Sequence, residues 1–545
     1  MSARAVPRDA AVGEGGLFTR QASGLVREIG VPAAVGMSIG SVACVNLLIA
    51  FPGFTSAFSK VDFYVPILSA GVFWLIAMLA YRHLVQAIPR AGGEYVYVSR
   101  IISPLAGALA GIATAIILIF TLAANINIAA TYTPFMFTAL GDAFGSSGLS
   151  NLSGHLTGQL PVALISAGIL LVVGAAVMLS LKRLAQVVLA MVIVQFVALL
   201  VLAILLLTHS TADFAAAFGR YSHHPDAYRA LVDLGKAKGI PYGVGVSAMV
   251  ALLPVGILAY SGVLYSHYLG GEMRKPGRTY LWASSISILL LMGVWVLLWA
   301  LVRHTVGLHF VQAQANVAAA DPNGYGKITG LASGIGALGY GLVLSGDPIS
   351  KILIGVAVPI ASVAVGLTFT AIVARVLLAL AFDRMLPVGI AKVSQRTHAP
   401  VTAIAIVIVV AIGFCVLLSY TDITGMLSLL SLFLLLVVLG GGIAATFLAH
   451  RRPDLVLKPG QTEVARWLGV PRSTWAGGLT TALATFAIIE IVVHRSVYLV
   501  LDAQSVISIV VVLLAGPVVY LCARAIRRQR SDMDLSMAMH ELPPE

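Results

Sequence analysis

Residues 31–41 read VPAAVGMSIGS, and residues 253–262 read LPVGILAYSG. Each segment lies within a long apolar run and places a proline just before a cluster of glycine and serine. Proline removes a backbone donor and clashes with the preceding helical turn, and glycine tolerates the irregular backbone that follows. The two segments therefore predict two helices that are interrupted part-way along their length.

Twelve apolar runs, including the two that contain these segments, have the length of about 20 residues that crossing a bilayer requires. They span residues 28–50, 63–87, 102–132, 158–181, 183–208, 243–269, 279–303, 351–381, 400–420, 423–449, 474–494 and 498–523. Of the 545 residues, 59% are hydrophobic and 10% are charged, whereas soluble domains carry roughly 25% charged residues. The chain is therefore predicted to be an all-α polytopic membrane protein with twelve transmembrane helices and the lipid bilayer as its solvent.

The net charge of +12 follows the predicted topology. Basic residues gather in alternate connections, with clusters at residues 182–183, 274–275, 451–452 and 524–530. Cytoplasmic loops of membrane proteins carry an excess of Lys and Arg. We therefore expect a multi-pass protein of the cytoplasmic membrane with both termini in the cytosol. A charge spread over many short loops does not indicate a nucleic-acid partner.

The interrupted segments belong to the first and sixth predicted spans, five spans apart. Interrupted helices at matching places in two halves point to an inverted repeat with a binding site between the halves. The predicted organisation is a cytosolic tail at 1–27, a five-helix repeat at 28–208, an external loop at 209–242, a second repeat at 243–449, helices 11 and 12 at 450–523, and a cytosolic tail at 524–545.

Breaking a helix inside a bilayer frees N–H and C=O groups that lipid cannot satisfy. We expect the outer half of the first span to start near Ser41, with its positive end suited to a carboxylate, and the inner half to end near Gly36, with carbonyls suited to an ammonium. A zwitterionic amino acid fits such poles. The predicted substrate-binding residues are Gly36, Met37, Ser38, Ile39, Gly40, Ser41, Ala259, Tyr260, Ser261 and Gly262. The alternative is that Gly36 and Gly40 form a Gly-x-x-x-Gly surface for helix packing.

Three further segments carry a family resemblance: PRAGGEYVY at 89–97, GGEMRKP at 270–276 and ARVLLALAFDRMLP at 374–387. Their order and their positions relative to the spans resemble the signature motifs of the amino acid–polyamine–organocation superfamily, and the resemblance covers about residues 25–450. It is closest to prokaryotic amino acid permeases. It implies a leucine-transporter-type fold, alternating access, and a substrate bound between spans one, three, six and eight. Ser38 stands where the family usually has a second glycine.

Several polar residues within the spans are candidates for supporting roles. Thr368 and Thr370 could form a sodium site with carbonyls of the first break, although hydroxyls in membrane helices often bond their own backbone. Asn125 and Asn127 are candidates for lining the path. His267 suggests a proton relay, and the alternative is an interfacial histidine. The coupling ion is therefore open between H⁺, Na⁺ and none.

No catalytic or metal-binding pattern is found in the sequence. There is no phosphate-binding loop, metalloprotease motif or nucleophile elbow, and the three cysteines offer no zinc spacing. The chain is expected to be a secondary transporter of amino acids, working as a symporter or antiporter, rather than an enzyme, and to need no cofactor. A polyamine or organic-amine exchanger and a non-transporting amino acid sensor are the alternatives. The oligomeric state is left open.

Overall fold

The computed structural model describes residues 27–58, 60–331, 334–421, 424–457, 465–499 and 503–531. Residues 1–26 and 532–545 are not among the described residues. The predicted tails at 1–27 and 524–545 therefore lie largely outside the described part of the chain.

The described residues of the first half of the chain form helices joined by short connections. Its helices are α1 (Val31–Gly40), α2 (Asn46–Ala57), α3 (Tyr64–Ala87), α4 (Glu94–Ile101), α5 (Pro104–Thr131), α6 (Thr133–Phe144), α7 (Ser147–His155), α8 (Gln159–Val177), α9 (Leu181–Thr208), α10 (Thr211–Tyr221) and α11 (Ala227–Ala237). The next segment contains α12 (Val246–Ala251), α13 (Leu253–Tyr260) and the 3₁₀ helices η1 (Ser261–Tyr268) and η2 (Gly270–Glu272).

The second half continues in the same way. It contains α14 (Pro276–Thr305), α15 (Leu308–Ala320), α16 (Pro322–Thr329), α17 (Ala337–Leu344), α18 (Pro348–Phe382), η3 (Val388–Ala391), α19 (Val401–Tyr420), α20 (Thr424–Arg451), α21 (Pro453–Val456), α22 (Arg472–Val493), α23 (Arg495–Tyr498) and α24 (Ala503–Ser531). The two short strands, β1 (Arg466–Trp467) and β2 (Val470–Pro471), pair antiparallel. The predicted all-α polytopic class is confirmed.

Within the described residues, eleven helical segments are long and apolar enough to cross a membrane. They correspond to the second to twelfth predicted runs. The first predicted run is instead divided between α1 and α2, of 10 and 12 residues, each shorter than a bilayer requires. The predicted interruption of this run is therefore present in the structure.

The first interruption lies later than the sequence suggested. The helix α1 continues through Gly36 to Gly40, and α2 begins at Asn46 after a turn in which Ala43 has a φ of 48°. The expected boundaries near Gly36 and Ser41 were wrong by several residues. The reason is that Pro32 occupies the first turn of α1, where a missing N–H costs no helical hydrogen bond.

The sixth predicted span is interrupted twice. The helix α12 ends at Ala251, and α13 follows with Pro254 in its first turn. At Ser261 the α-helix gives way to the 3₁₀ helix η1, which continues to Tyr268. A 3₁₀ segment of this length is uncommon, since such runs usually extend over only about 3–4 residues.

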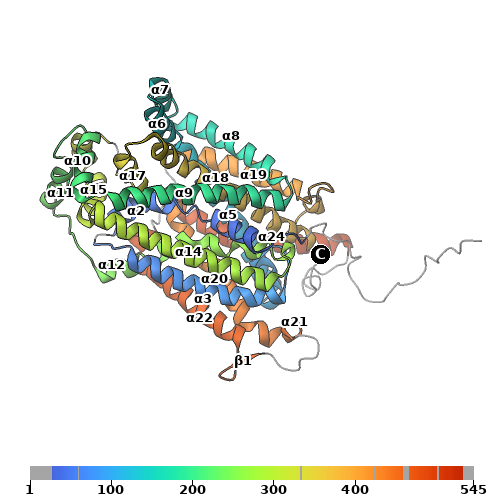
Figure 1. Ribbon diagram of the computed structural model, residues 1–545. Coiled ribbons are helices and arrows are strands. Elements are labelled where there is room, and N and C mark those ends of the chain that lie inside the picture. Colours follow the sequence, from blue (N-terminus) through green and yellow to red (C-terminus); the bar gives the residue numbers. More distant parts are fainter. Residues whose placement is uncertain are drawn as a thin grey trace, which may run out of the picture.

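Figure 1 shows the long helices running side by side, with α10, α11 and α15 gathered at one end of the bundle and α21 and β1 at the other. We call these the α10 end and the α21 end. The helix α4 lies at the α21 end, because Arg451 at the close of α20 donates to the carbonyls of Ile101 and Ile102 beside the end of α4. The helix α18 is highly enclosed, contacting α5, α6, α8, α9 and α19.

Glycine allows α20 and α22 to pack closely. A Cβ atom on Gly477 of α22 would lie 2.3 Å from the backbone nitrogen of Thr446 and 2.7 Å from the carbonyl oxygen of Gly442, both on α20. A Cβ atom on the next residue, Gly478, would meet nothing within 4 Å. The contact between α20 and α22 therefore requires glycine at one position and not at its neighbour.

This contrast provides a test of the packing. We expect Gly477→Ala to lower the free energy of unfolding by about 1–3 kcal/mol, because the added methyl group overpacks a backbone contact. Gly478→Ala should raise it by about 0.4–1 kcal/mol, since alanine restricts the unfolded chain at an open helical position. Unfolding of both variants in mixed micelles measures the difference, and equal effects would contradict the close packing of α20 on α22.

Candidate functional site

The two interruptions lie directly against each other. The hydroxyl oxygen of Ser41 is 2.8 Å from the carbonyl oxygen of Gly262 and 2.9 Å from that of Ser38. A Cβ atom on Gly262 would lie 2.4 Å from the carbonyl oxygen of Ser41, so only glycine allows this approach. The turn after α1 and the start of η1 therefore form one contiguous region of irregular backbone.

Two tryptophans satisfy carbonyl groups that the interruptions leave without helical partners. The indole N–H of Trp295 on α14 donates to the carbonyl of Cys44, at 3.0 Å. The indole N–H of Trp74 on α3 donates to the carbonyl of Ile257, one turn before η1, at 2.8 Å. Both side chains are almost wholly buried. Each interruption is thus held by an indole from a neighbouring long helix.

Three amide N–H groups at the start of α2 have no backbone carbonyl as a partner among the described residues. They are the N–H groups of Ala43, Cys44 and Val45. They lie at the positive end of α2, where the unsatisfied donors and the helix dipole both favour an anion. The thiol of Cys44 is directed to α9, where it donates to the side-chain oxygen of Gln195 at 3.0 Å.

The predicted residues of α1 have two environments. Gly36 and Gly40 face α9, because Cβ atoms on them would lie 3.1 Å from Leu189 and 2.3 Å from Val188. This is the geometry of the helix-packing alternative. Met37, Ser38 and Ile39 are buried, and the hydroxyl of Ser38 has no hydrogen-bond partner among the described residues.

On the sixth span, Tyr260 is oriented toward α3. Its hydroxyl donates to the carbonyl of Ile67 at 3.2 Å, and its ring packs edge-on against Trp295 at 4.5 Å between centroids. Ala259 and Tyr260 line a small cavity with Phe54, Phe63 and Ile67 on the α10 side of the interruptions. Ser261 and Gly262 begin η1, so the four predicted residues of this span surround the point where it changes geometry.

The remaining candidates lie on the helices around the interruptions. Thr368 of α18 is close to α1, with its hydroxyl oxygen 3.5 Å from a Cβ atom placed on Gly40, but it donates to its own backbone at Ala364. Thr370 is buried, and its hydroxyl has no partner within the described residues. The side-chain amide of Asn125 donates to Thr121 in its own helix, and that of Asn127 donates to Ser419 on α19.

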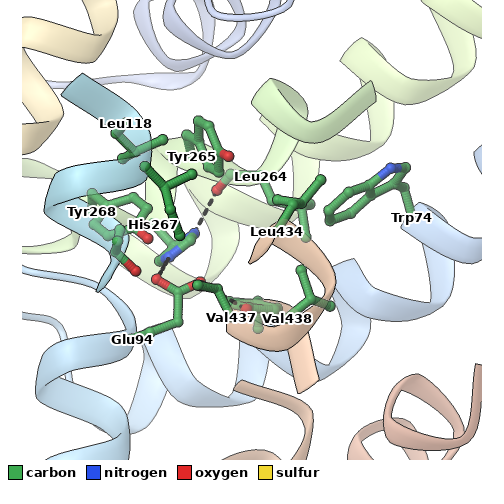
Figure 2. A pocket seen from close by; sticks show the side chains of 13 residues that line it. Trp74, Glu94, Leu118, Leu264, Tyr265, His267, Tyr268, Leu434, Val437 and Val438 are labelled. Atoms are coloured by element: carbon green, nitrogen blue, oxygen red, sulfur yellow. Dashed lines mark hydrogen bonds and ion pairs between the residues drawn. The ribbon is translucent and has the colours of Figure 1, made fainter. Parts of the chain in front are cut away.

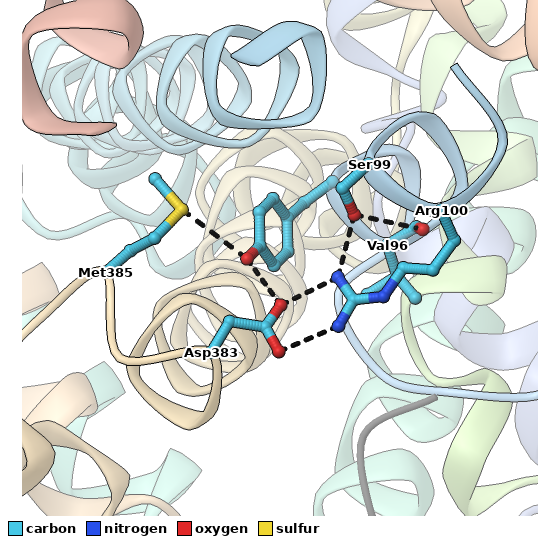
Figure 3. A network of polar contacts seen from close by, with 6 residues as sticks. Val96, Ser99, Arg100, Asp383 and Met385 are labelled. Carbon is cyan, nitrogen blue, oxygen red and sulfur yellow. Dashed lines mark hydrogen bonds and ion pairs between the residues drawn. The ribbon is translucent and has the colours of Figure 1, made fainter. Parts of the chain in front are cut away.

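Residues of the three motif segments meet at the α21 end. Arg375 of α18 forms two hydrogen bonds to Glu272 of η2, at 2.9 and 3.2 Å. Asp383, just after α18, accepts from Arg100 of α4 at 2.7 Å and from the hydroxyl of Tyr95 (Figure 3). The charged groups in both pairs are almost completely enclosed. Paired charges therefore connect α4, η2 and α18.

The segment before α1 is attached to the same region by its backbone. The N–H of Ile29 donates to the carbonyl of Glu272 at 2.9 Å, and the N–H of Arg274 donates to the carbonyl of Ile29 at 3.1 Å. With the contact between Ser41 and Gly262, these bonds join both ends of α1 to the segment formed by η1 and η2. The two are therefore connected as one unit.

A third buried polar cluster joins α4 to η1. The side chains of Glu94 and His267 are 2% and 1% exposed, with His267 Nε2 3.1 Å from Glu94 Oε2, and the hydroxyl of Tyr81 donates to the other carboxylate oxygen at 2.7 Å (Figure 2). Sequence reasoning placed His267 near the cytosolic face without a partner. It missed the pairing because residues 94 and 267 are far apart in the chain. Only their predicted placement on the same side of the membrane could have suggested that they meet.

Breaking the pair of Glu272 and Arg375 tests how much these contacts stabilise the protein. We expect Glu272→Gln to lower the free energy of unfolding by about 3–5 kcal/mol, because it leaves a buried guanidinium without its countercharge. The control is Asp233→Asn, which removes a similar pair with Lys236 whose side chains are 70% and 62% exposed. That change should cost less than about 1 kcal/mol. Unfolding in mixed micelles compares them, and a negligible effect at Glu272 would rule out a stabilising role.

Comparison with known proteins supports the identification of the chain as a membrane transporter. No curated protein matches the chain. A family model described as amino acid permease matches residues 34–532, which include both interruptions and all three motif segments. A match over most of the chain's length shows its family, and we conclude that the chain belongs to the amino acid permease family.

Proposed function

We propose that this membrane protein is a secondary transporter that moves neutral α-amino acids across the cytoplasmic membrane by alternating access. Family membership supports an amino acid or amine transporter in general. The observation that carries the finer proposal is the contact between the two interruptions at Ser41 and Gly262. On one side of it lie amide N–H groups that donate to no backbone carbonyl among the described residues. Binding, rather than bond-making chemistry, is what such a backbone arrangement offers.

The chemistry of the interruptions favours a zwitterion. The N–H groups of residues 43–45 would receive the carboxylate, and the carbonyls around Gly40 and Ala259 would receive the ammonium group. Neither interruption contains an acidic residue between 31 and 45 or between 252 and 268. A polyamine carries only positive charge and would normally require a carboxylate partner, so the polyamine exchanger is the second candidate.

Alternating access requires that one end of the bundle opens while the other closes. At the α21 end, α1 moves together with η1 and η2 because backbone hydrogen bonds connect them. The pair of Glu272 and Arg375 then holds this unit against α18, and its separation would open a path to the cytosol. We propose that the unit rocks within two inverted five-helix repeats, at 28–208 and 243–449. The same scaffold in a non-transporting sensor would bind its ligand without flux.

Sodium coupling has one structural argument in its favour. Thr368 lies beside Gly40, and Thr370 on the same helix has a buried hydroxyl without a partner among the described residues. Oxygen atoms of this kind are the usual ligands of small hard cations. The bond from Thr368 to its own backbone supports the competing structural role. Proton coupling and exchange are the other possibilities.

Counterflow in proteoliposomes tests the substrate class. We expect labelled neutral amino acids to exchange with the same amino acid inside the vesicles, and putrescine and spermidine to compete weakly. The assay is run over the standard amino acids, with and without sodium. Binding without exchange would favour the sensor, and exchange restricted to polyamines would reverse the proposed preference.

Gly262→Ala tests whether the two interruptions must touch. The added methyl group would lie against the carbonyl oxygen of Ser41, so we expect the rate of counterflow to fall at least about tenfold, the factor that corresponds to about 1.4 kcal/mol. The matched control is Gly293→Ala in α14, where a Cβ atom would meet nothing within 4 Å. Full activity of Gly262→Ala would contradict a site built on this contact.

A further inference from the structure

We infer that Glu94 and His267 form a proton-binding site that couples substrate transport to proton movement. The inference rests on the proposed transport function and adds the identity of the ion and its site. It begins with the hydrogen bonds of the imidazole. His267 Nδ1 lies 2.7 Å from the carbonyl oxygen of Leu264, and a carbonyl can only accept, so Nδ1 must carry a hydrogen atom.

This tautomer fixes what lies between the two side chains. In a neutral imidazole that is protonated at Nδ1, Nε2 has only a lone pair. That lone pair would face the carboxylate oxygen of Glu94 at 3.1 Å. Two acceptors at this distance repel, so one proton lies between them. It is either on Nε2, opposite an ionised carboxylate, or on Glu94, donating to a neutral imidazole. In both forms the pair is neutral overall.

Removing this proton would leave a net negative charge inside the protein. Burial of an unpaired charge is costly, and both side chains are enclosed. Among the described residues, the other titratable groups that face the pair are phenols, which supply no positive charge to compensate. They are Tyr81 from α3, Tyr97 from α4, Tyr265 and Tyr268 from η1, and Tyr280 from α14. The closed arrangement therefore requires the proton, and its loss favours separation of η1 from α4.

A small cavity that can hold a water molecule lies next to the pair. Glu94, His267, Tyr265 and Tyr268 line this cavity, whose other walls include the apolar side chains of Leu118, Leu434 and Val438 (Figure 2). The cavity has room for about one water molecule, the minimum that a polar site needs to hold one. When η1 moves away from α4, the proton on Nε2 or Oε2 passes to water, and the carboxylate remains ionised.

The position of His267 on η1 connects the proton to the substrate. The same 3₁₀ helix begins at Ser261 and Gly262, where the two interruptions touch, and it ends one residue beyond His267. A substrate that shifts the start of η1 therefore shifts the histidine relative to Glu94 on α4. Because both events act on one short helix, binding of the substrate and of the proton are thermodynamically linked.

The test uses the full chain in proteoliposomes without sodium. The probes are a neutral amino acid that exchanges in counterflow and a pH-sensitive dye inside the vesicles. With the wild type, substrate entry should acidify the vesicle interior. An inward proton gradient of one pH unit should raise accumulation of the substrate up to about tenfold if one proton enters with each substrate. Net substrate entry without proton movement would overturn the inference, whereas absence of exchange for every substrate would refute the proposed function instead.

Variants locate the site. Glu94→Gln keeps the shape of the side chain, and its amide donates to the neutral imidazole, but it cannot release a proton. We expect proton movement per substrate and stimulation by the pH gradient to be lost in this variant and in His267→Gln, while counterflow, which needs no net proton movement, remains measurable. Wild-type proton movement per substrate in either variant would overturn the inference.

The control is Glu490→Gln. It removes the carboxylate from a second Glu–His pair, in which His494 Nδ1 lies 3.4 Å from Glu490 Oε2, and which belongs to α22 and its C-terminal end rather than to α4 or η1. Its proton movement per substrate should equal that of the wild type. A loss equal to that of Glu94→Gln would show a non-specific effect and overturn the assignment to Glu94 and His267.

Discussion

The absence of water in the bilayer core is the constraint on which this structure depends. Every N–H and C=O group freed by an interruption in a spanning helix must find a partner in the protein or in a ligand. Trp74, Trp295 and Ser41 provide partners for three such carbonyls. The N–H groups of residues 43–45 donate to no backbone carbonyl within the described part of the chain. In the proposed site, the solute would meet the backbone groups that the protein does not satisfy itself.

The sequence predicted the class of the fold because the length and spacing of apolar runs reflect the bilayer directly. It predicted that the first span is interrupted, but it placed the interruption several residues too early. A proline and several glycines permit an irregular backbone within a turn or two, and tertiary contacts select the residue. Pro32 was compatible with the start of a helix, and the close contact with α9 keeps Gly36 and Gly40 helical. The binding role of these residues stays a prediction.

The buried ionic contacts could not be predicted for a different reason. Spacing along one helix shows which side chains share a face, but no spacing relates Glu94 to His267 or Glu272 to Arg375, which are brought together by the path of α4 and the 3₁₀ geometry of η1 and η2. The motif segments indicated which residues matter, but they did not indicate which residues those contact. In the structure one charge pair joins two of these segments, since Glu272 of the second is neutralised by Arg375 of the third.

The hydrogen bonds between Ile29 and the segment around Glu272 have a practical consequence for work with the protein. They use only backbone atoms, but the side chain of Ile29 is itself fully buried in the core, so both the position and the identity of this residue matter. A bulky fusion partner joined immediately before residue 27 would lie only two residues from these bonds and would disturb the connection between α1 and η2 directly. Purification tags and fluorescent reporters are therefore better placed upstream, behind a flexible spacer.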